Sequence, residues 1–231
     1  LSLPLDSPWQ QGETLQVTLQ YTVHFPHIQY RFGWWEDTFM AGQAFAVPAL
    51  WQDGAYRTDA WLPIGDPLSG ECANYQLHLT VPKGYTCAAS GSMTGLTQSD
   101  DGRMQYTLEA PAVREVGLVV SPSLRKEARI VDGVLLQACA ARGTDANRLL
   151  KVAQEALACF SSLYGDYPYG TFTVCAAPMG VSGVEYPGMV MIAETLLQAD
   201  NKALEYAIVH EAAHQWWYSL VGSDSSTHPW M

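Results

Sequence analysis

The chain has 231 residues, of which 48% are apolar and only 15% are charged. This composition supplies core material for one large domain or two ordinary ones and argues against intrinsic disorder. The net charge is −11 and no cluster of Lys and Arg occurs, so neither nucleic acid nor an anionic membrane is expected as a partner. The five cysteines form no CxxC pair, and no apolar run is long enough for a membrane segment.

The first half of the sequence predicts an antiparallel β-sheet assembly. Thr14–Val23 alternates apolar and polar residues at a period of two, which is typical of a half-buried strand. Four shorter runs of the same character follow and are separated by turn residues such as Asp-Gly pairs. These runs cover residues 75–81, 104–108, 116–120 and 128–138.

The pattern changes near Gly143. Thr144 or Asp145 can cap a helix whose apolar residues recur at helical spacing up to residue 163, and Gly165 would end it. Two strand-like runs, 171–176 and 189–193, flank a loop rich in Gly and Pro, and a second helix is expected at about 202–220. We therefore expect an α+β chain with a boundary at residue 141: a partial antiparallel β domain over 1–141 and a mixed α/β domain over 142–231.

The motif that indicates chemistry is HExxH, at residues 210–214 within the second predicted helix. Residues four apart share a helix face, so His210 and His214 can bind one ion from the same side, and imidazole is a good zinc ligand. Glu211 lies beside the first histidine, where it can act as general base on a metal-activated water and then as general acid toward the leaving amine.

A catalytic zinc ion needs a third protein ligand. The metzincin pattern is excluded because Trp217 and Leu220 stand where it requires Gly and His. A carboxylate downstream of the helix is therefore expected, and the nearest candidates within the chain are Asp224 and His228. Asp224 is too close to the helix end to fold back easily, and His228 is followed directly by Pro229.

The segment VHEAAHQWWYSLVGSDSSTHPWM resembles the zinc helix of the aminopeptidase N family. In that family a ligand Glu lies nineteen residues after the second His, which would be two positions beyond Met231. The resemblance therefore implies a zinc exopeptidase with a thermolysin-like α/β catalytic domain, and this chain would contain the first part of that domain. The third zinc ligand and a catalytic Tyr would lie beyond this chain. The chain also begins with Leu1, so we expect a piece of a longer protein that would itself be inactive.

A second segment, SGVEYPG at residues 182–188, resembles the family's exopeptidase motif. The resemblance implies that Glu185 binds the free α-amino group of a peptide substrate and that the backbone around Gly183 and Val184 holds the peptide extended. It also implies a Gln or Glu from the β domain at the same subsite, for which Gln43 is the candidate. Taken alone, Glu185 and Gln43 would be ordinary surface side chains. The segment YGDYPY, at 164–169, resembles a packing turn of the family.

We therefore predict a zinc-dependent aminopeptidase that removes N-terminal residues from peptides. Trp216, Trp217 and Tyr218 are interpreted as core residues around the helix. Two alternatives remain: a metal-binding or scaffold domain that has lost catalysis, and an endopeptidase or epoxide hydrolase on the same scaffold. The response to a substrate without a free amino terminus separates these enzymes.

Overall fold

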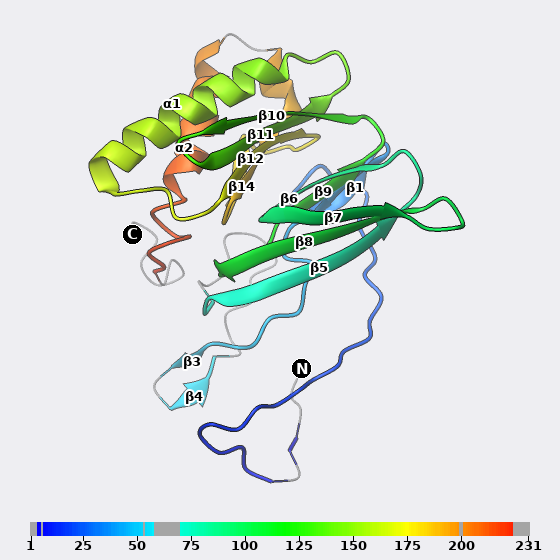
Figure 1. Cartoon of the computed structure of the whole chain (residues 1–231), viewed down its shortest axis with the longest axis vertical. Helices are drawn as coiled ribbons and strands as arrows, with labels where there is room; N and C mark the ends of the chain where they lie inside the picture. Colours follow the sequence, from blue (N-terminus) through cyan, green and yellow to red (C-terminus); the bar gives the residue numbers. More distant parts are fainter. Residues whose placement is uncertain (1–3, 6, 53, 58–69, 199–200, 224–231) are drawn as a thin grey trace.

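The computed structural model describes residues 4–5, 7–52, 54–57, 70–198 and 201–223 (Figure 1). The amino-terminal half forms three antiparallel sheets, with strand orders β1-β2-β9-β6, β5-β8-β7 and β3-β4. Their strands are β1 (Phe32–Trp35), β2 (Thr38–Ala41), β3 (Trp51–Gln52), β4 (Ala55–Tyr56), β5 (Ala73–Val81), β6 (Thr86–Ala89), β7 (Ser92–Gln98), β8 (Met104–Val113) and β9 (Leu118–Ser121).

The rest of the described chain forms a five-stranded mixed sheet with helices on one face. Its strand order is β10-β11-β12-β14-β13, with two parallel pairs in the middle and an antiparallel strand at each edge. The elements are β10 (Leu124–Val131), β11 (Val134–Ala141), α1 (Ala146–Tyr164), β12 (Thr171–Ala177), β13 (Gly183–Tyr186), β14 (Met189–Ala193), the 3₁₀ helix η1 (Glu194–Leu197) and α2 (Asn201–Ala213). The sheet therefore takes strands from both sides of residue 141.

The molecule is layered, with the helices above the five-stranded sheet and the other sheets below it (Figure 1). One core lies between the helices and the mixed sheet, and it includes Leu149, Phe172 and Ile208. A second core lies between that sheet and the four-stranded sheet, and it includes Met40 and Met191. Because both faces of β12 are covered, the strand is apolar or small throughout and every residue of it is buried.

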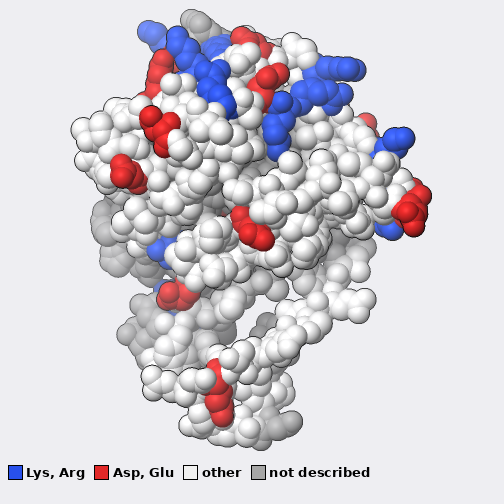
Figure 2. Space-filling view, viewed as in Figure 1, with Lys and Arg blue, Asp and Glu red and all other residues white. Residues whose placement is uncertain are grey.

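Local predictions for the later half are largely confirmed. Asp145 caps α1 by accepting a hydrogen bond from the Asn147 amide at 3.1 Å, and Gly165 ends the helix with a φ of 99°. The Asp132-Gly133 turn joins β10 to β11, and Gly133 takes the positive φ of 82° that such a hairpin turn requires. Charged side chains gather over this helical layer, around α1 and β10, on the face drawn in Figure 2.

The expected thermolysin-like α/β catalytic domain is wrong. Strands make up 40% of the structure and α-helices only 17%, with two α-helices in the described part of the chain. The predicted second helix was also too long, because α2 ends at Ala213 and the following residues form a tight turn in which Tyr218 has a φ of 97°. An α-helix cannot continue through a left-handed residue. The chain is therefore mostly β.

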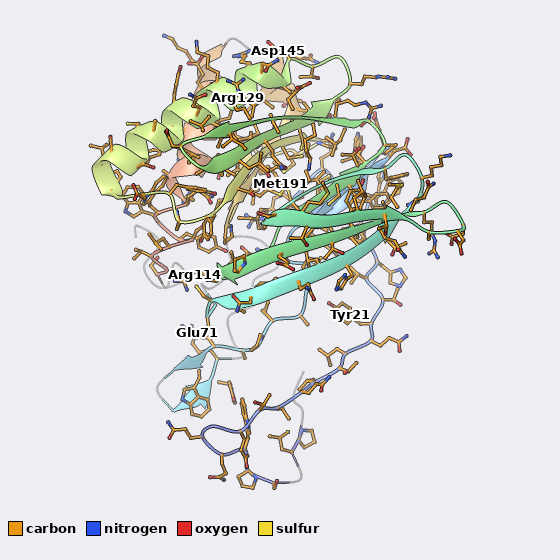
Figure 3. All side chains as sticks on the ribbon, in the orientation of Figure 1. Tyr21, Glu71, Arg114, Arg129, Asp145 and Met191 are labelled. Carbon is orange, nitrogen blue, oxygen red and sulfur yellow. The ribbon has the colours of Figure 1, made fainter. Side chains whose placement is uncertain are left out.

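The first predicted strand is also wrong. Residues 14–23 form no strand, and most of their apolar side chains are exposed on a segment that extends away from the sheets (Figure 1). Tyr21, labelled in Figure 3, accepts a hydrogen bond from the Ala46 amide at 3.3 Å. Alternation predicts a strand only where a neighbouring strand pairs with it, and no described strand does so here. No described helix has the length and apolar character needed to cross a membrane.

Candidate metal centre

The carboxyl end of α2 and strand β13 bring three ligand-type side chains together. The donor atoms of Glu185, Glu211 and His214 all lie within 4.8 Å of one another. His210 is not in this group, but its ring stands edge to face with that of His214, with 5.0 Å between the ring centroids. The rings of His210 and His214 therefore lie close together, but the three-donor group takes its third member, Glu185, from a different element.

Glu211 is the most buried member of the cluster, with 6% of its surface exposed. Its side chain lies directly against the backbone of Gly183, since a Cβ added at that glycine would stand 2.4 Å from the Glu211 Oε1 atom. No side chain at position 183 could occupy that space unless Glu211 moved. Gly183 was predicted to contact the peptide substrate through its backbone. The structure adds a steric role, because the missing side chain at this position leaves space for the Glu211 carboxylate.

His214 lies just beyond the last residue of α2, and the turn that follows orients its ring. Its Nδ1 atom is 3.2 Å from the carbonyl oxygen of Trp217. A carbonyl oxygen only accepts, so Nδ1 carries the proton in this hydrogen bond, and in the neutral ring Nε2 keeps its lone pair. Histidines that ligate metals are commonly oriented this way by a backbone carbonyl, and the group of Glu185, Glu211 and His214 could hold a metal ion.

Gln215 connects the carboxyl end of α2 to the β13–β14 hairpin, which contains Glu185, through hydrogen bonds. It is fully buried, its Oε1 accepts from the Gly188 amide at 2.8 Å, and its Nε2 donates to the Tyr186 carbonyl at 3.1 Å. Both bonds satisfy backbone groups at the β13–β14 turn. Gln215 therefore fixes the distance between Glu185 and the HExxH residues, which neither element fixes alone.

The aromatic residues after the motif play different parts. Trp216 is 3% exposed and donates from Nε1 to the Gly165 carbonyl at 2.9 Å, which confirms it as a core residue. Trp217 is 40% exposed and is not a core residue in the described part of the chain. Tyr167, from the predicted packing turn, lies 5.9 Å from Trp216 between ring centroids.

A hollow of about 510 Å³ opens beside the cluster and is lined by His210 and Glu211 from α2 and by Ser182 and Gly183 at the start of β13. Such a volume is typical of a site for a small ligand. β13 is an edge strand of its sheet, so no described strand pairs with its outer side. Val184 is 1% exposed and points into the second core, which leaves only its backbone for contact with a ligand.

Gln43 does not join the three-donor cluster. It lines a separate cavity of about 370 Å³, together with Glu115 and Tyr218, and its backbone is left-handed with a φ of 57°. The Tyr218 hydroxyl donates to the Glu115 carboxylate. Burial raises the pKa of Tyr218 well above its usual value, and the negative charges of Glu115 and Glu185 raise it further. Tyr218 is thus a neutral phenol that lines this second cavity.

Sequence reasoning missed the roles of Arg114, Glu115, Gln215 and Tyr218. Gln215 follows the motif directly, and a polar residue inside an apolar helical pattern was a usable signal. Arg114 and Glu115 carried no signal, because their partners lie about a hundred residues away. Asp224, His228, Trp230 and Met231 lie outside the described residues. The sequence matches no known family model.

Proposed function

We propose that the protein to which this chain belongs is a zinc-dependent aminopeptidase. The observation that carries the proposal is the convergence of Glu185, Glu211 and His214 within 4.8 Å, with His210 beside them. His210 and His214 would hold the ion through their imidazole nitrogens. A bound zinc ion would act as a Lewis acid that polarises the scissile carbonyl and acidifies a water molecule.

Glu211 supplies the proton transfers in this proposal. Its carboxylate takes a proton from the attacking water and delivers it to the nitrogen of the leaving peptide. Contact with Gly183 supports this role, because it limits where the Glu211 side chain can go. A carboxylate with a restricted position can stay aligned with the water that gives up the proton and with the nitrogen that receives it.

Glu185 selects the substrate terminus. Its half-exposed carboxylate at the edge strand β13 can form a charge-assisted hydrogen bond with a protonated α-amino group. The unpaired backbone of Gly183 and Val184 can pair with an extended peptide, as edge strands do in other peptide sites. Together these contacts set the first peptide bond of the substrate against the polarising ion.

The first test replaces the general base. Glu211→Gln removes the proton carrier and retains both histidines, so zinc content should be unchanged while kcat falls by about 10²–10⁴-fold. His214→Ala is the matched control, and it should lose the metal together with activity. Metal analysis by mass spectrometry and hydrolysis of an aminoacyl anilide measure the two effects. Near-normal turnover in the zinc-loaded Glu211→Gln protein would refute the assignment.

The second test concerns the free amino terminus. A peptide with a free α-amino group should be cleaved, whereas the same peptide acetylated at its N-terminus should not be. Glu185→Gln should raise KM and lower kcat, because the contact both binds and positions the substrate. Its zinc affinity, measured by competition with a chromophoric chelator, should stay unchanged.

Two outcomes would contradict the role of Glu185. Equal cleavage of the free and acetylated peptides would indicate an endopeptidase. A loss of zinc affinity in Glu185→Gln as large as that in His214→Ala would make Glu185 a metal ligand rather than an amine-binding group.

A further inference from the structure

We propose that Arg114 is a positioning residue for His214. It holds the turn whose Trp217 carbonyl orients the imidazole, and it does so from the β8–β9 connection, which belongs to the sheets rather than to α2. The inference rests on the proposed function insofar as His214 is taken to bind metal.

The turn after α2 is closed by backbone hydrogen bonds that begin at the helix end. The Ser219 amide donates to the His214 carbonyl at 3.0 Å, the Val221 amide donates to the Trp216 carbonyl at 3.0 Å, and the Tyr218 amide donates to the Val221 carbonyl at 2.8 Å. The Trp217 carbonyl then accepts from His214 Nδ1. The direction of the His214 ring is thus coupled to the shape of the turn.

This turn needs support from outside. Tyr218 adopts a φ of 97°, a backbone conformation that side chains with a Cβ adopt only when their surroundings enforce it. Its hydroxyl is held by Glu115, from the same connection as Arg114. The support for the turn therefore comes from two consecutive residues that are about a hundred positions away in sequence.

Arg114 binds the backbone of the turn directly. Its Nε donates to the carbonyls of Tyr218 at 3.0 Å and Ser219 at 3.3 Å, and its Nη2 approaches the Leu220 carbonyl at 3.5 Å. Nη1 donates to the Gly70 carbonyl at 2.7 Å, which ties the guanidinium to the sheet side. Only the planar fork of an arginine reaches all of these acceptors at once. Arg114, labelled in Figure 3, lies at the carboxyl end of β8.

Glycine at position 222 fits the same arrangement. A Cβ added there would stand 2.6 Å from the Arg114 Cζ atom, so the guanidinium packs flat against the chain as it leaves the turn. The guanidinium of Arg114 thus meets the turn through backbone carbonyls and through the backbone of Gly222.

The experiment compares Arg114→Ala and Arg114→Lys with a matched control, Arg125→Ala. Arg125 also donates to backbone carbonyls, those of Pro122 and Leu124, but to none in the turn. Two readouts are taken in each purified protein: zinc affinity by chelator competition, and the tautomer of His214 in the zinc-free protein from long-range ¹⁵N–¹H spectra. A His214→Gln variant assigns the resonance, and thermal unfolding verifies that each variant is folded.

In the unaltered protein and in Arg125→Ala, the proton of the neutral His214 ring should be on Nδ1. Both Arg114 variants should lose this preference and bind zinc about tenfold more weakly, at the lower end of the effect of removing groups that orient metal ligands. Lysine at position 114 should not restore the tautomer preference or the zinc affinity, since a single ammonium group cannot reach all the carbonyls that Arg114 contacts. If Arg114→Ala does not fold, the folded Arg114→Lys variant still gives both the tautomer and the zinc affinity.

An unchanged tautomer in the Arg114 variants would overturn the inference. So would a zinc affinity equal to that of Arg125→Ala. Absence of zinc binding in the unaltered protein would instead refute the proposed function, and the tautomer would then decide alone whether Arg114 positions His214.

Discussion

Glu211 lies directly against the backbone of Gly183. The carboxylate is 6% exposed, and the glycine leaves it just enough space beside β13. An HExxH motif is recognised from the helix alone, but here the position of the proposed general base also depends on a residue of the neighbouring strand. A change of one carbon atom at position 183 therefore tests the geometry of the base without changing any ionisable group.

Gly183→Ala should displace Glu211 and lower kcat/KM by about 100-fold, because small misplacements of a catalytic group are costly. Zinc content should remain normal, since His210 and His214 are untouched. Gly170→Ala is the control: a Cβ at that position meets nothing within 4 Å. Steady-state hydrolysis of an aminoacyl anilide measures the effect. Equal activity of the Gly183→Ala and Gly170→Ala proteins would show that Glu211 needs no such placement.

At the scale of elements, α2 and the β13–β14 hairpin act as one unit. Gln215 bridges them with two buried hydrogen bonds, to the Gly188 amide and the Tyr186 carbonyl. Tyr186 at the end of β13 is itself fully buried, with Gly42 and Gly117 packed so close that neither could carry a side chain. The hairpin is therefore fixed on both sides, which holds Glu185 at a constant distance from the helix.

Gln215→Ala should lower the free energy of unfolding by about 2–4 kcal/mol, because two buried backbone groups lose their partners. Gln98→Ala removes an exposed bond to the Gly102 carbonyl and should cost less than about 1 kcal/mol. Urea unfolding followed by tryptophan fluorescence gives both values. Equal effects of the two substitutions would mean that water replaces Gln215 in the bridge.

For the molecule as a whole, the stacking of helices and sheets buries several groups that ionise at high pH. Burial raises the pKa of Cys87 to about 12, and burial followed by the neighbouring Cys72 raises the pKa of Tyr169 to about 12. The folded state holds these protons more tightly than the unfolded chain, in which the thiol and phenol ionise near their ordinary values of 9.0 and 10.0.

The contribution of these two groups to stability should therefore be constant below about pH 9 and fall as the pH rises toward 12, since a raised pKa contributes stability only while the group stays protonated. Tyr169→Phe cannot ionise, so its unfolding free energy should fall less steeply between pH 10 and 12. Tyr56→Phe, at an exposed position, is the control. Urea unfolding at pH 8 to 11.5 measures the slopes, and identical slopes in the two variants would contradict the assignment to Tyr169.

The sequence by itself determined what depends on neighbouring residues. The strand runs at 75–81 and 104–108, the capping Asp145 and the stop at Gly165 follow from local propensity and turn chemistry, and the structure confirms them. The four-residue spacing of His210 and His214 likewise sufficed to bring their rings together. Each of these rests on interactions within a few residues.

Only the tertiary structure decided the rest, because the deciding contacts are distant in sequence. The left-handed Tyr218 that ends the helical pattern is held by Arg114 and Glu115, more than a hundred residues earlier. Residues 14–23 carry the pattern of a strand but have no described partner to pair with. The mostly β architecture replaced the expected thermolysin-like domain because strand pairing is settled by which segments meet in space, and residue pattern alone does not encode that choice.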